Sequence, residues 1–586
     1  MKKIASELLV ERLIEWGVDT VFGLPGDGIN GIMEGLRRHE DKVRFILVHH
    51  EEAAAFMATG YAKSTGKVGV CLATSGPGGL HLLNGLYDAK LDHAPVLAIT
   101  GLQGTQQLGT GYQQEVHLER VMEDVAAYNV AVQVPGPIAT LVDFAIKTAL
   151  ADKTVSHITF PVDLQEADPE VVPWQGGLGV ARTPESSPRY LEGRIVPAPE
   201  SLEQAARLLN EGGRVVLFAG AGAIGAGSEV LRAAELLASP IVKTLPGKAS
   251  VPDAHPLVLG GIGLLGTRPS EEAMEQCDTI LMVGTNFPYT RFLPEHARAV
   301  QIDREPKRIG NRLAVDVALA GDAKQTLSAL IPLLKEKAER SFLVRAQEGM
   351  ESWRGKMAAL EDPARSPIAP QYLMSVIDKL AEDDAVLCSD SGTVATWAAR
   401  HFDIRGNRRF YLSSNLASMA CAVPYANAIQ AAYPGRQCLA FVGDGGFAML
   451  MAEFMTAVRN ELPVKVVVNN NGALGQILWE QMALGYPEMG VRFERAFNFA
   501  PWAQSCGGFG VRVEDPAEVE PAVRNALAFE GPALVDVVVN PDEPPMPSKV
   551  TYEQAKGFVE SFLRGQPRRA SITSTLLRDK ITELTD

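Results

Sequence analysis

Two polar turns within the stretch 437–475 carry the residue types of a metal site. Residues 443–446 read Gly-Asp-Gly-Gly, and residues 469–473 read Asn-Asn-Asn-Gly-Ala. A carboxylate, a side-chain amide and a freed backbone carbonyl form an all-oxygen set, which suits Mg2+ completed by phosphate oxygens and water. The glycines allow backbone N–H groups and a helix N-terminus to approach those phosphates. The stretch therefore predicts a Mg2+ site next to phosphate groups, with Asp444 and Asn471 as ligands.

Regular elements must bring these two turns together. The apolar run 437–442 predicts a strand, and 464–468 is a continuous apolar run of the kind found in buried parallel strands. Between them, apolar residues recur with helical spacing from Phe447 to Leu462. A right-handed crossover places the carboxyl ends of the two strands side by side, so Asp444 and Asn471 can reach one point.

This joint pattern resembles the diphosphate–Mg2+ motif of thiamine-diphosphate-dependent enzymes. The resemblance covers nearly the whole chain and is to the pyruvate oxidase/pyruvate:quinone dehydrogenase branch. It implies thiamine diphosphate, Mg2+ and FAD as cofactors, with the carbonyl of Ala473 as a further metal ligand. It also implies diphosphate contacts around the two turns, at Gly443, Gly445, Gly446, Leu474 and Gly475.

A second Gly-Asp-Gly triplet illustrates why the triplet alone is a weak signal. It occupies residues 26–28, and the positions that correspond to the amide pair are Ala53 and Ala54. Alanine side chains cannot bind a metal. We therefore expect this triplet to form a turn near the substrate, with Gly26 close to the cofactor.

Glu51 is the candidate catalytic residue of the N-terminal region. It follows a predicted strand at 43–48 and begins an alanine-rich helix. The residues alone favour an ordinary role, in which Glu51 or Glu52 complements the dipole in the first helical turn. The resemblance implies instead that Glu51 is the glutamate that hydrogen-bonds the thiamine pyrimidine. It further implies that Ser75, in the turn 75–79, and Asn84, in the following helix, border the cofactor.

Alternating helical and strand patterns predict an α/β fold with three consecutive parallel-sheet domains. We place a pyrimidine-binding domain at 1–180, a middle FAD-type domain at 190–345 and a diphosphate-binding domain at 365–541. A C-terminal tail occupies 542–586. Linker-like segments rich in proline separate the domains at 181–200 and 357–371.

The middle domain carries glycine turns at the ends of its predicted strands. None is a clean G-x-G-x-x-G fingerprint with an acidic residue about 20 positions later. The resemblance implies FAD binding here, although related decarboxylases that have lost the flavin retain the same strand pattern. The expected FAD contacts are Gly220, Gly222, Gly263, Leu265, Gly284, Thr285, Asn286, Asp303 and Asp322.

Two further segments of the third domain belong to the expected cofactor site. Ser391 and Gly392 follow a predicted strand at 385–388. Residues 415–420 resemble the family's loop in which a bulky apolar side chain bends thiamine into a V-shape. Met419 matches that side chain, with Ala417 and Ser418 beside it, whereas the residue type alone favours a core filler.

The resemblance implies oxidative decarboxylation of a 2-oxo acid, most simply pyruvate, with electrons passing to FAD and then to quinone or O2. Gln113 stands where the family usually has an aromatic residue, and Gln476 stands where quinone-linked relatives have phenylalanine. Glu480 stands at a position that is also acidic in quinone-linked relatives. These amides leave open a different 2-oxo acid. They also leave open an acetolactate-synthase-like carboligase, a non-oxidative decarboxylase or a non-enzymatic flavoprotein.

Composition and charge restrict the partners and the compartment. The 586-residue chain has 46% hydrophobic and 21% charged residues, as expected of a globular protein. A formal charge of −15 without a basic stripe argues against nucleic acid. Six scattered cysteines predict free thiols and a cytoplasmic location. The N-terminus does not resemble a signal peptide, and no apolar run reaches about 18 residues.

The resemblance also implies self-association, because in the family Glu51 and the diphosphate site come from different subunits. A homodimer is then the smallest active unit, and a homotetramer is compatible with it. The tail contains three arginines followed by apolar residues at helical spacing up to Leu584. This pattern fits a helix that docks on the protein, and it leaves open a weak peripheral contact with the inner face of the membrane.

Overall fold

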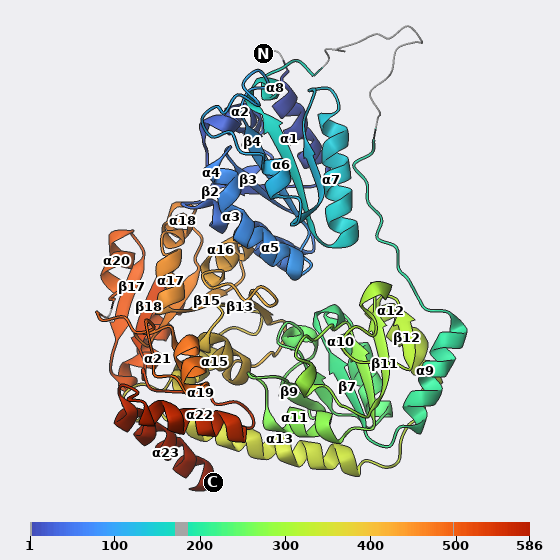
Figure 1. The fold of residues 1–586 in the computed structure, drawn as a ribbon, viewed down its shortest axis with the longest axis vertical. Helices are drawn as coiled ribbons and strands as arrows, with labels where there is room; N and C mark the ends of the chain where they lie inside the picture. The colour runs from blue at the N-terminus through green and yellow to red at the C-terminus, as the bar shows by residue number, and fades with distance from the viewer. Residues whose placement is uncertain (1–2, 170–185, 496, 586) are drawn as a thin grey trace.

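The computed structural model describes residues 3–169, 186–495 and 497–585. These residues form three six-stranded sheets, and every strand pair in them is parallel. Helices cover the sheets, and Figure 1 shows the three α/β units with the middle one beside the C-terminal one. The predicted fold class is therefore confirmed. The strands named from the sequence are present, with ends within about two residues of those expected from the apolar runs.

The first sheet has the strand order β2-β1-β3-β4-β6-β5. Its carboxyl edge leads into helix α3, whose first residue is Glu51. The strands are β1 (Thr20–Gly23), β2 (Arg44–Leu47), β3 (Gly69–Ala73), β4 (Val96–Leu102), β5 (Ala126–Ala131) and β6 (Val155–Pro161). The helices are α1 (Ala5–Glu15), α2 (Asn30–Arg38), α3 (Glu51–Thr65), α4 (Pro77–His81), α5 (Leu83–Leu91), α6 (Leu118–Val121), α7 (Ile138–Asp152) and α8 (Val162–Gln165).

The middle sheet has the order β12-β11-β10-β7-β8-β9. Read from the other side, and numbered within the domain, this is 3-2-1-4-5-6, the order of doubly wound nucleotide-binding sheets. The strands are β7 (Val215–Ala219), β8 (Ile241–Lys243), β9 (Val258–Gly261), β10 (Thr279–Val283), β11 (Arg298–Asp303) and β12 (Val317–Ala320). The helices are α9 (Pro199–Glu211), α10 (Gly227–Leu236), α11 (Arg268–Gln276) and α12 (Ala323–Leu330).

The third sheet, β14-β13-β15-β16-β18-β17, repeats the strand order of the first. Its strands are β13 (Val386–Ser389), β14 (Arg409–Tyr411), β15 (Cys438–Gly443), β16 (Lys465–Asn470), β17 (Phe509–Val513) and β18 (Ala533–Val538). Its helices are α14 (Pro370–Leu380), α15 (Thr393–His401), α16 (Ala422–Ala432), α17 (Asp444–Met449), α18 (Glu453–Arg459), α19 (Gly475–Ala483), α20 (Ala500–Ser505) and α21 (Pro516–Ala528).

One predicted helix is two helices in the structure. The segment expected to run from Phe447 to Leu462 breaks between α17 and α18. Phe447 and Phe454, one in each helix, both lie beside the ring of Trp502. Helical spacing of apolar residues survives such a short break, so the periodicity could not reveal it.

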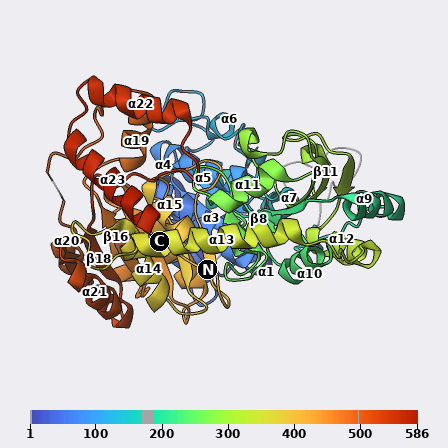
Figure 2. The same cartoon turned by 90° about the horizontal axis from the view of Figure 1, so that it is seen from below.

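The linkers and the tail connect or cover the three units. Of the segment 181–200, residues up to 185 lie outside the described part, and α9 begins at Pro199. Helix α13 (Ser341–Leu360) passes under the middle and third units, and it contacts α23 (Arg569–Thr585) of the tail (Figures 1 and 2). The other tail helix, α22 (Tyr552–Leu563), packs on α19. Among the described residues, no helix is both long and apolar enough to cross a membrane.

Candidate active site

Asp444 lies at the carboxyl end of β15, as the first residue of α17. Its side chain is buried, and among the described residues neither carboxylate oxygen has a hydrogen bond of good geometry. Burial raises the pKa of Asp444 to about 7, although the nearby N–H groups of Gly445 and Gly472 oppose this rise. A buried carboxylate with such weak partners gains stability when a cation or proton joins it. The Asp444 side chain therefore fits the predicted Mg2+ ligand.

The second turn supplies the remaining oxygen donors. Asn471 follows β16, and its Oδ1 accepts a hydrogen bond from the N–H of Ala473 at 3.1 Å. A side chain at Gly475 would come within 2.7 Å of Nδ2 of Asn471, which explains the glycine there. Asn470 is committed elsewhere, because its Nδ2 donates to Asp536 at 2.8 Å. Asn471 remains the candidate metal ligand of the amide pair, with its Oδ1 in the same turn as Ala473.

The structure also shows why the other glycines of this edge are required. A Cβ on Gly445 would lie 2.9 Å from Leu474, and one on Gly446 would collide with the carboxylate of Asp390. Gly443 precedes α17, and Gly392, with φ of 107°, precedes α15. Backbone groups and the N-termini of α15 and α17 are therefore found at the same edge of the sheet. Ser391, which directly precedes Gly392, belongs to the same turn. This arrangement suits a diphosphate.

Asp390 is a residue of this edge that the sequence did not reveal. It is fully buried, and its two oxygens accept hydrogen bonds from the N–H groups of Ala420 and Ala422, both at 2.9 Å. Burial raises the pKa of Asp390 to about 6. Asp390 comes shortly after the predicted strand 385–388, and this position was the signal that the sequence offered. The loop that Asp390 binds is about 30 residues away in the chain, so the sequence did not connect the two.

The predicted thiamine loop has an unusual backbone. Ala417 and Ala420 have φ values of 57° and 68°, in the left-handed region that alanine rarely adopts. Met419 is half-buried and lies outside the core clusters. Ser418 accepts a hydrogen bond from Nδ2 of Asn84 at 2.9 Å, so the structure brings two predicted cofactor residues from different domains together.

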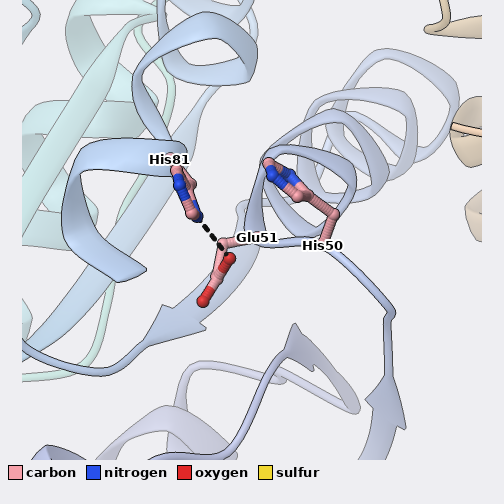
Figure 3. Close-up of side chains that lie close together, drawn as sticks. All are labelled: His50, Glu51 and His81. Atoms are coloured by element: carbon pink, nitrogen blue, oxygen red, sulfur yellow. Dashed lines mark hydrogen bonds and ion pairs between the residues drawn. The ribbon is translucent and has the colours of Figure 1, made fainter. Parts of the chain in front are cut away.

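Glu51 is buried at the start of α3, and its carboxylate has a defined partner (Figure 3). Oε2 of Glu51 lies 2.9 Å from Nδ1 of His81, and the ring of His81 stacks on that of His50 at 4.5 Å. A Cβ on Gly78 would lie 3.3 Å from Oε1 of Glu51, so the glycine leaves space beside this oxygen. Glu52, by contrast, binds Asn84. The sequence did not assign a role to His81, which ends the short helix α4 after the turn 75–79.

The other predicted residues of this half surround the same turn. Oγ of Ser75 lies 3.3 Å from Gln114, and a side chain on Gly26 would collide with Thr74. Gln113 itself is exposed.

On α19, Gln476 donates from Nε2 to Glu480 at 2.9 Å, so its Oε1 points away from that carboxylate. Among the described residues this buried Oε1 has no partner.

The predicted FAD residues gather in part at the switch point between β7 and β10. Side chains on Gly220, Gly222 or Gly284 would collide with the neighbouring turn, so only glycine fits these positions. Oδ1 of Asn286 is buried and has no partner among the described residues, which fits a ligand contact. Thr285 adjoins Gly220 in this turn.

The remaining expected FAD contacts have mixed surroundings. The Oδ1 atom of Asp322 caps α12, where it accepts from Gln325 at 2.9 Å, and the Oδ1 atom of Asp303 accepts from Glu305 at 2.9 Å. The carbonyl of Leu265 accepts from Arg400 at 3.3 Å. Gly263 has φ of 99°. Leu265 also lines a small pocket of about 20 Å3 where the middle domain meets α15.

Comparison with known proteins identifies the three domains. Thiamine pyrophosphate enzyme models match the chain as the N-terminal TPP binding domain at 4–121, the central domain at 202–330 and the C-terminal TPP binding domain at 390–537.

Similar proteins extend this match over nearly the full length. The thiamine pyrophosphate-containing protein YdaP of Bacillus subtilis is 42% identical, over 96% of each chain. Pyruvate oxidase of Lactiplantibacillus plantarum is 32% identical, over 94% of this chain and 91% of its own. The acetolactate synthase large subunit of Corynebacterium glutamicum is 31% identical, over 92% and 87%. Together with the geometry of the C-terminal edge, these matches establish that the chain belongs to the thiamine-pyrophosphate-dependent enzyme family.

Proposed function

We propose that this enzyme catalyses the oxidative decarboxylation of a 2-oxo acid, most simply pyruvate, with FAD as electron carrier and a quinone or O2 as final acceptor. The observation that carries the oxidative part is the switch point of the middle sheet. Three glycines there let the turns after β7 and β10 pack closely, and the nearby Asn286 has a buried oxygen without a partner among the described residues. Crevices at such switch points bind nucleotide cofactors. The pyruvate oxidase relative supports the same reading.

The chain's own residues would hold the cofactor at two sheet edges. Asp444, Asn471 and the carbonyl of Ala473 would hold Mg2+, and the glycines around them would leave room for the diphosphate. When bound, thiamine diphosphate supplies a nucleophilic carbon and an electron sink for loss of CO2.

Glu51 would control the proton at the pyrimidine. His81 fixes its Oε2 at 2.9 Å, which leaves Oε1 beside Gly78 to hydrogen-bond the pyrimidine nitrogen. A carboxylate in a pocket of low polarity forms a strong hydrogen bond and holds a proton at a defined atom. The half-buried Met419 would support the bent cofactor. The carbonyl of Ala417 would accept a hydrogen bond from the amino group of the cofactor's pyrimidine.

Acetolactate synthesis is the second candidate. The glutamines at 113 and 476 stand where the oxidase branch has aromatic residues, and the free Oε1 of Gln476 offers an acceptor to a polar group. Acetolactate synthases are also among the similar proteins. A carboligase would retain the same three domains and the same roles for Glu51 and Asp444. The two functions differ only in the steps after decarboxylation.

One experiment separates these readings. The flavin absorbance of the purified protein is followed without oxygen after addition of thiamine diphosphate, Mg2+ and pyruvate, and the products are analysed. The proposal expects bleaching that depends on pyruvate. Flavin that stays oxidised while acetolactate accumulates would replace it with carboligation. A protein without flavin that releases free aldehyde would make it a non-oxidative decarboxylase. If pyruvate is inert, the same assay with a panel of 2-oxo acids decides the substrate.

We further infer that the enzyme works in the cytoplasm as a homodimer or homotetramer. Free buried cysteines support a reducing compartment, since among the described residues five of the six are buried and none is bonded to another. The structure supports docking as the main role of the tail, because Ile572 is buried and Asp579 pairs with Arg365, outside the tail, at 2.9 Å. Exposed Tyr552 and Leu563 on α22 are the residues that would make a weak membrane contact. Sedimentation with and without lipid vesicles tests both points.

A further inference from the structure

A buried ion pair of the N-terminal domain holds the beginning of the thiamine loop. Asp92 directly follows α5, and Lys63 lies near the end of α3. Nζ of Lys63 is 2.6 Å from Oδ2 of Asp92, and the two side chains are only 11% and 4% exposed. Neither residue was expected from the sequence to take part in the site.

Asp92 uses both of its oxygens on the loop. Oδ2 accepts hydrogen bonds from N and Oγ of Ser414 at 2.8 and 2.7 Å, and Oδ1 accepts from N and Nδ2 of Asn415 at 2.9 and 2.7 Å. Nζ of Lys63 donates to the carbonyl of Leu412 at 3.0 Å. A carboxylate that accepts this many bonds at one place fixes the direction in which the chain enters the loop.

The pair is charged at neutral pH. Burial disfavours the charged form of Asp92, but Lys63 and the donors of Ser414 outweigh it and lower the pKa of Asp92 to about 2. Burial likewise opposes the charge of Lys63, yet Asp88 and Asp92 raise its pKa. The hydrogen bonds to the loop are therefore charge-assisted, which makes them shorter and stronger than neutral ones.

The loop needs such support because of its backbone. Ala417 and Ala420 both have positive φ, and residues in this region persist only where the surroundings force them there. Asp390 binds the far end of the loop through Ala420. Within the loop, the N–H of Ser418 donates to Oγ of Ser413 at 2.9 Å. The loop is thus held at both ends, by one carboxylate from each domain.

We propose that Asp92, paired with Lys63, is a positioning residue that holds residues 413–420 in the shape that receives thiamine. The proposal rests on the proposed function only in taking this loop as the thiamine-binding one. Asp92 belongs to the N-terminal domain and the loop to the C-terminal domain. The same contact therefore also joins the N-terminal and C-terminal domains of one chain.

The test compares Asp92→Asn with Asp124→Asn in the full-length protein. Asparagine keeps the size of Asp92 but loses its charge and one acceptor. Asp124 is the matched control, since it is 74% exposed and pairs with Lys90 of the same helix α5 at 3.0 Å. Amide hydrogen exchange of residues 413–420 and the dissociation constant of thiamine diphosphate with Mg2+ are measured without substrate.

We expect Asp92→Asn to speed exchange in the loop and to weaken thiamine diphosphate roughly 10-fold, as for other residues that orient a ligand. The KM for the cofactor should rise, while kcat at saturating cofactor stays within about twofold of the wild type, a split that general destabilisation would not produce. Loop exchange and cofactor affinity equal to those of Asp124→Asn would overturn the proposal.

A milder variant covers the case in which Asp92→Asn does not fold. Ser414→Ala with Asn415→Ala removes two donors from the loop and leaves the buried ion pair intact. It should shift exchange and affinity in the same direction by a smaller factor, and no shift would also overturn the proposal. The loop exchange and the cofactor dissociation constant, which decide the proposal, are measured without pyruvate and flavin. Failure of the oxidative reading therefore leaves the proposal standing, and failure here leaves that reading standing.

Discussion

The N-terminal and C-terminal sheets have the same strand order but opposite chemistry at their carboxyl edges. Asp444 follows β15, whose counterpart β3 is followed by Thr74 and Ser75. The C-terminal edge offers oxygen ligands and backbone N–H groups. The N-terminal edge offers Glu51 and His81 instead, both from helices. One topology thus serves two ends of a cofactor, and the residues at the strand ends decide which end.

The two aspartates that follow the equivalent strands β1 and β13 show how burial makes the difference. Asp27 is exposed and accepts a hydrogen bond from its neighbour Gly28 at 3.0 Å, so it forms the expected turn. Asp390 is fully buried and binds the N–H groups of a distant loop. An acidic residue after a strand becomes part of a site only where other elements cover it.

The largest expected effect breaks the comparison at the N-terminal edge. Glu51→Gln should lower kcat by roughly 100-fold or more, because a neutral amide cannot hold the proton that a carboxylate holds. Cofactor affinity should change little, since the diphosphate edge is intact. Glu52→Gln is the matched control and should stay near wild type. Turnover of Glu51→Gln equal to that of the control would remove Glu51 from the mechanism.

The next prediction breaks the comparison at the C-terminal edge. Asp444→Ala should weaken the binding of Mg2+ and of thiamine diphosphate together by about 100-fold. Mutation of residues that only orient a metal ligand already lowers metal affinity by about 10–100-fold. The measurement is the rise in melting temperature on adding both ligands, which follows their affinity. Asp27→Ala, which changes the exposed aspartate of the other Gly-Asp-Gly triplet, should keep the full rise. Equal rises in both variants would place the metal elsewhere.

A contact between the C-terminal and N-terminal domains should make the stability of the protein depend on pH. Glu453 on α18 is buried and accepts a hydrogen bond from the N–H of His49 at 3.0 Å. Burial raises the pKa of Glu453 to about 7 from its ordinary 4.5. Between these values the folded state binds more protons than the unfolded state, so stability falls as pH rises through this window.

Glu453→Gln should remove that loss and raise the free energy of unfolding near pH 7 by up to about 3 kcal/mol relative to the wild type. Urea unfolding between pH 4.5 and 7.5 checks this. A variant that loses stability with pH as steeply as the wild type would show that Glu453 does not carry the effect.

The smallest expected effect concerns the backbone of the metal turn. Gly472 has φ of 65° with open space around it, and Gly17 of the N-terminal unit has φ of 78° in equally open space. Alanine at either position should cost about 1–2 kcal/mol of stability, because the left-handed region disfavours a Cβ. Only Gly472→Ala should also weaken Mg2+. Equal Mg2+ affinity in both variants would separate this turn from the metal.

The sequence was sufficient for the sheets and for placing Asp444 and Asn471 after neighbouring strands, but not for Asp390, which also follows a strand. Continuous apolar runs such as 464–468 predict buried parallel strands, and the crossover rule then brings Asp444 and Asn471 to one edge. The break between α17 and α18 was not predictable, because apolar spacing is the same on both sides of it. Residues that act through distant partners also escaped, since nothing near Asp92 in the chain indicates a loop more than 300 positions later.

The most direct test of the two-edge account uses Mn2+ as a paramagnetic substitute for Mg2+. Electron spin resonance of the protein with thiamine diphosphate reports whether Mn2+ is bound and whether phosphorus lies next to it. The account predicts a bound signal with phosphorus coupling in the wild type and in Asp27→Ala, and its loss in Asp444→Ala. A signal retained in Asp444→Ala, or lost in Asp27→Ala, would contradict the assignment of the metal and diphosphate to the C-terminal edge.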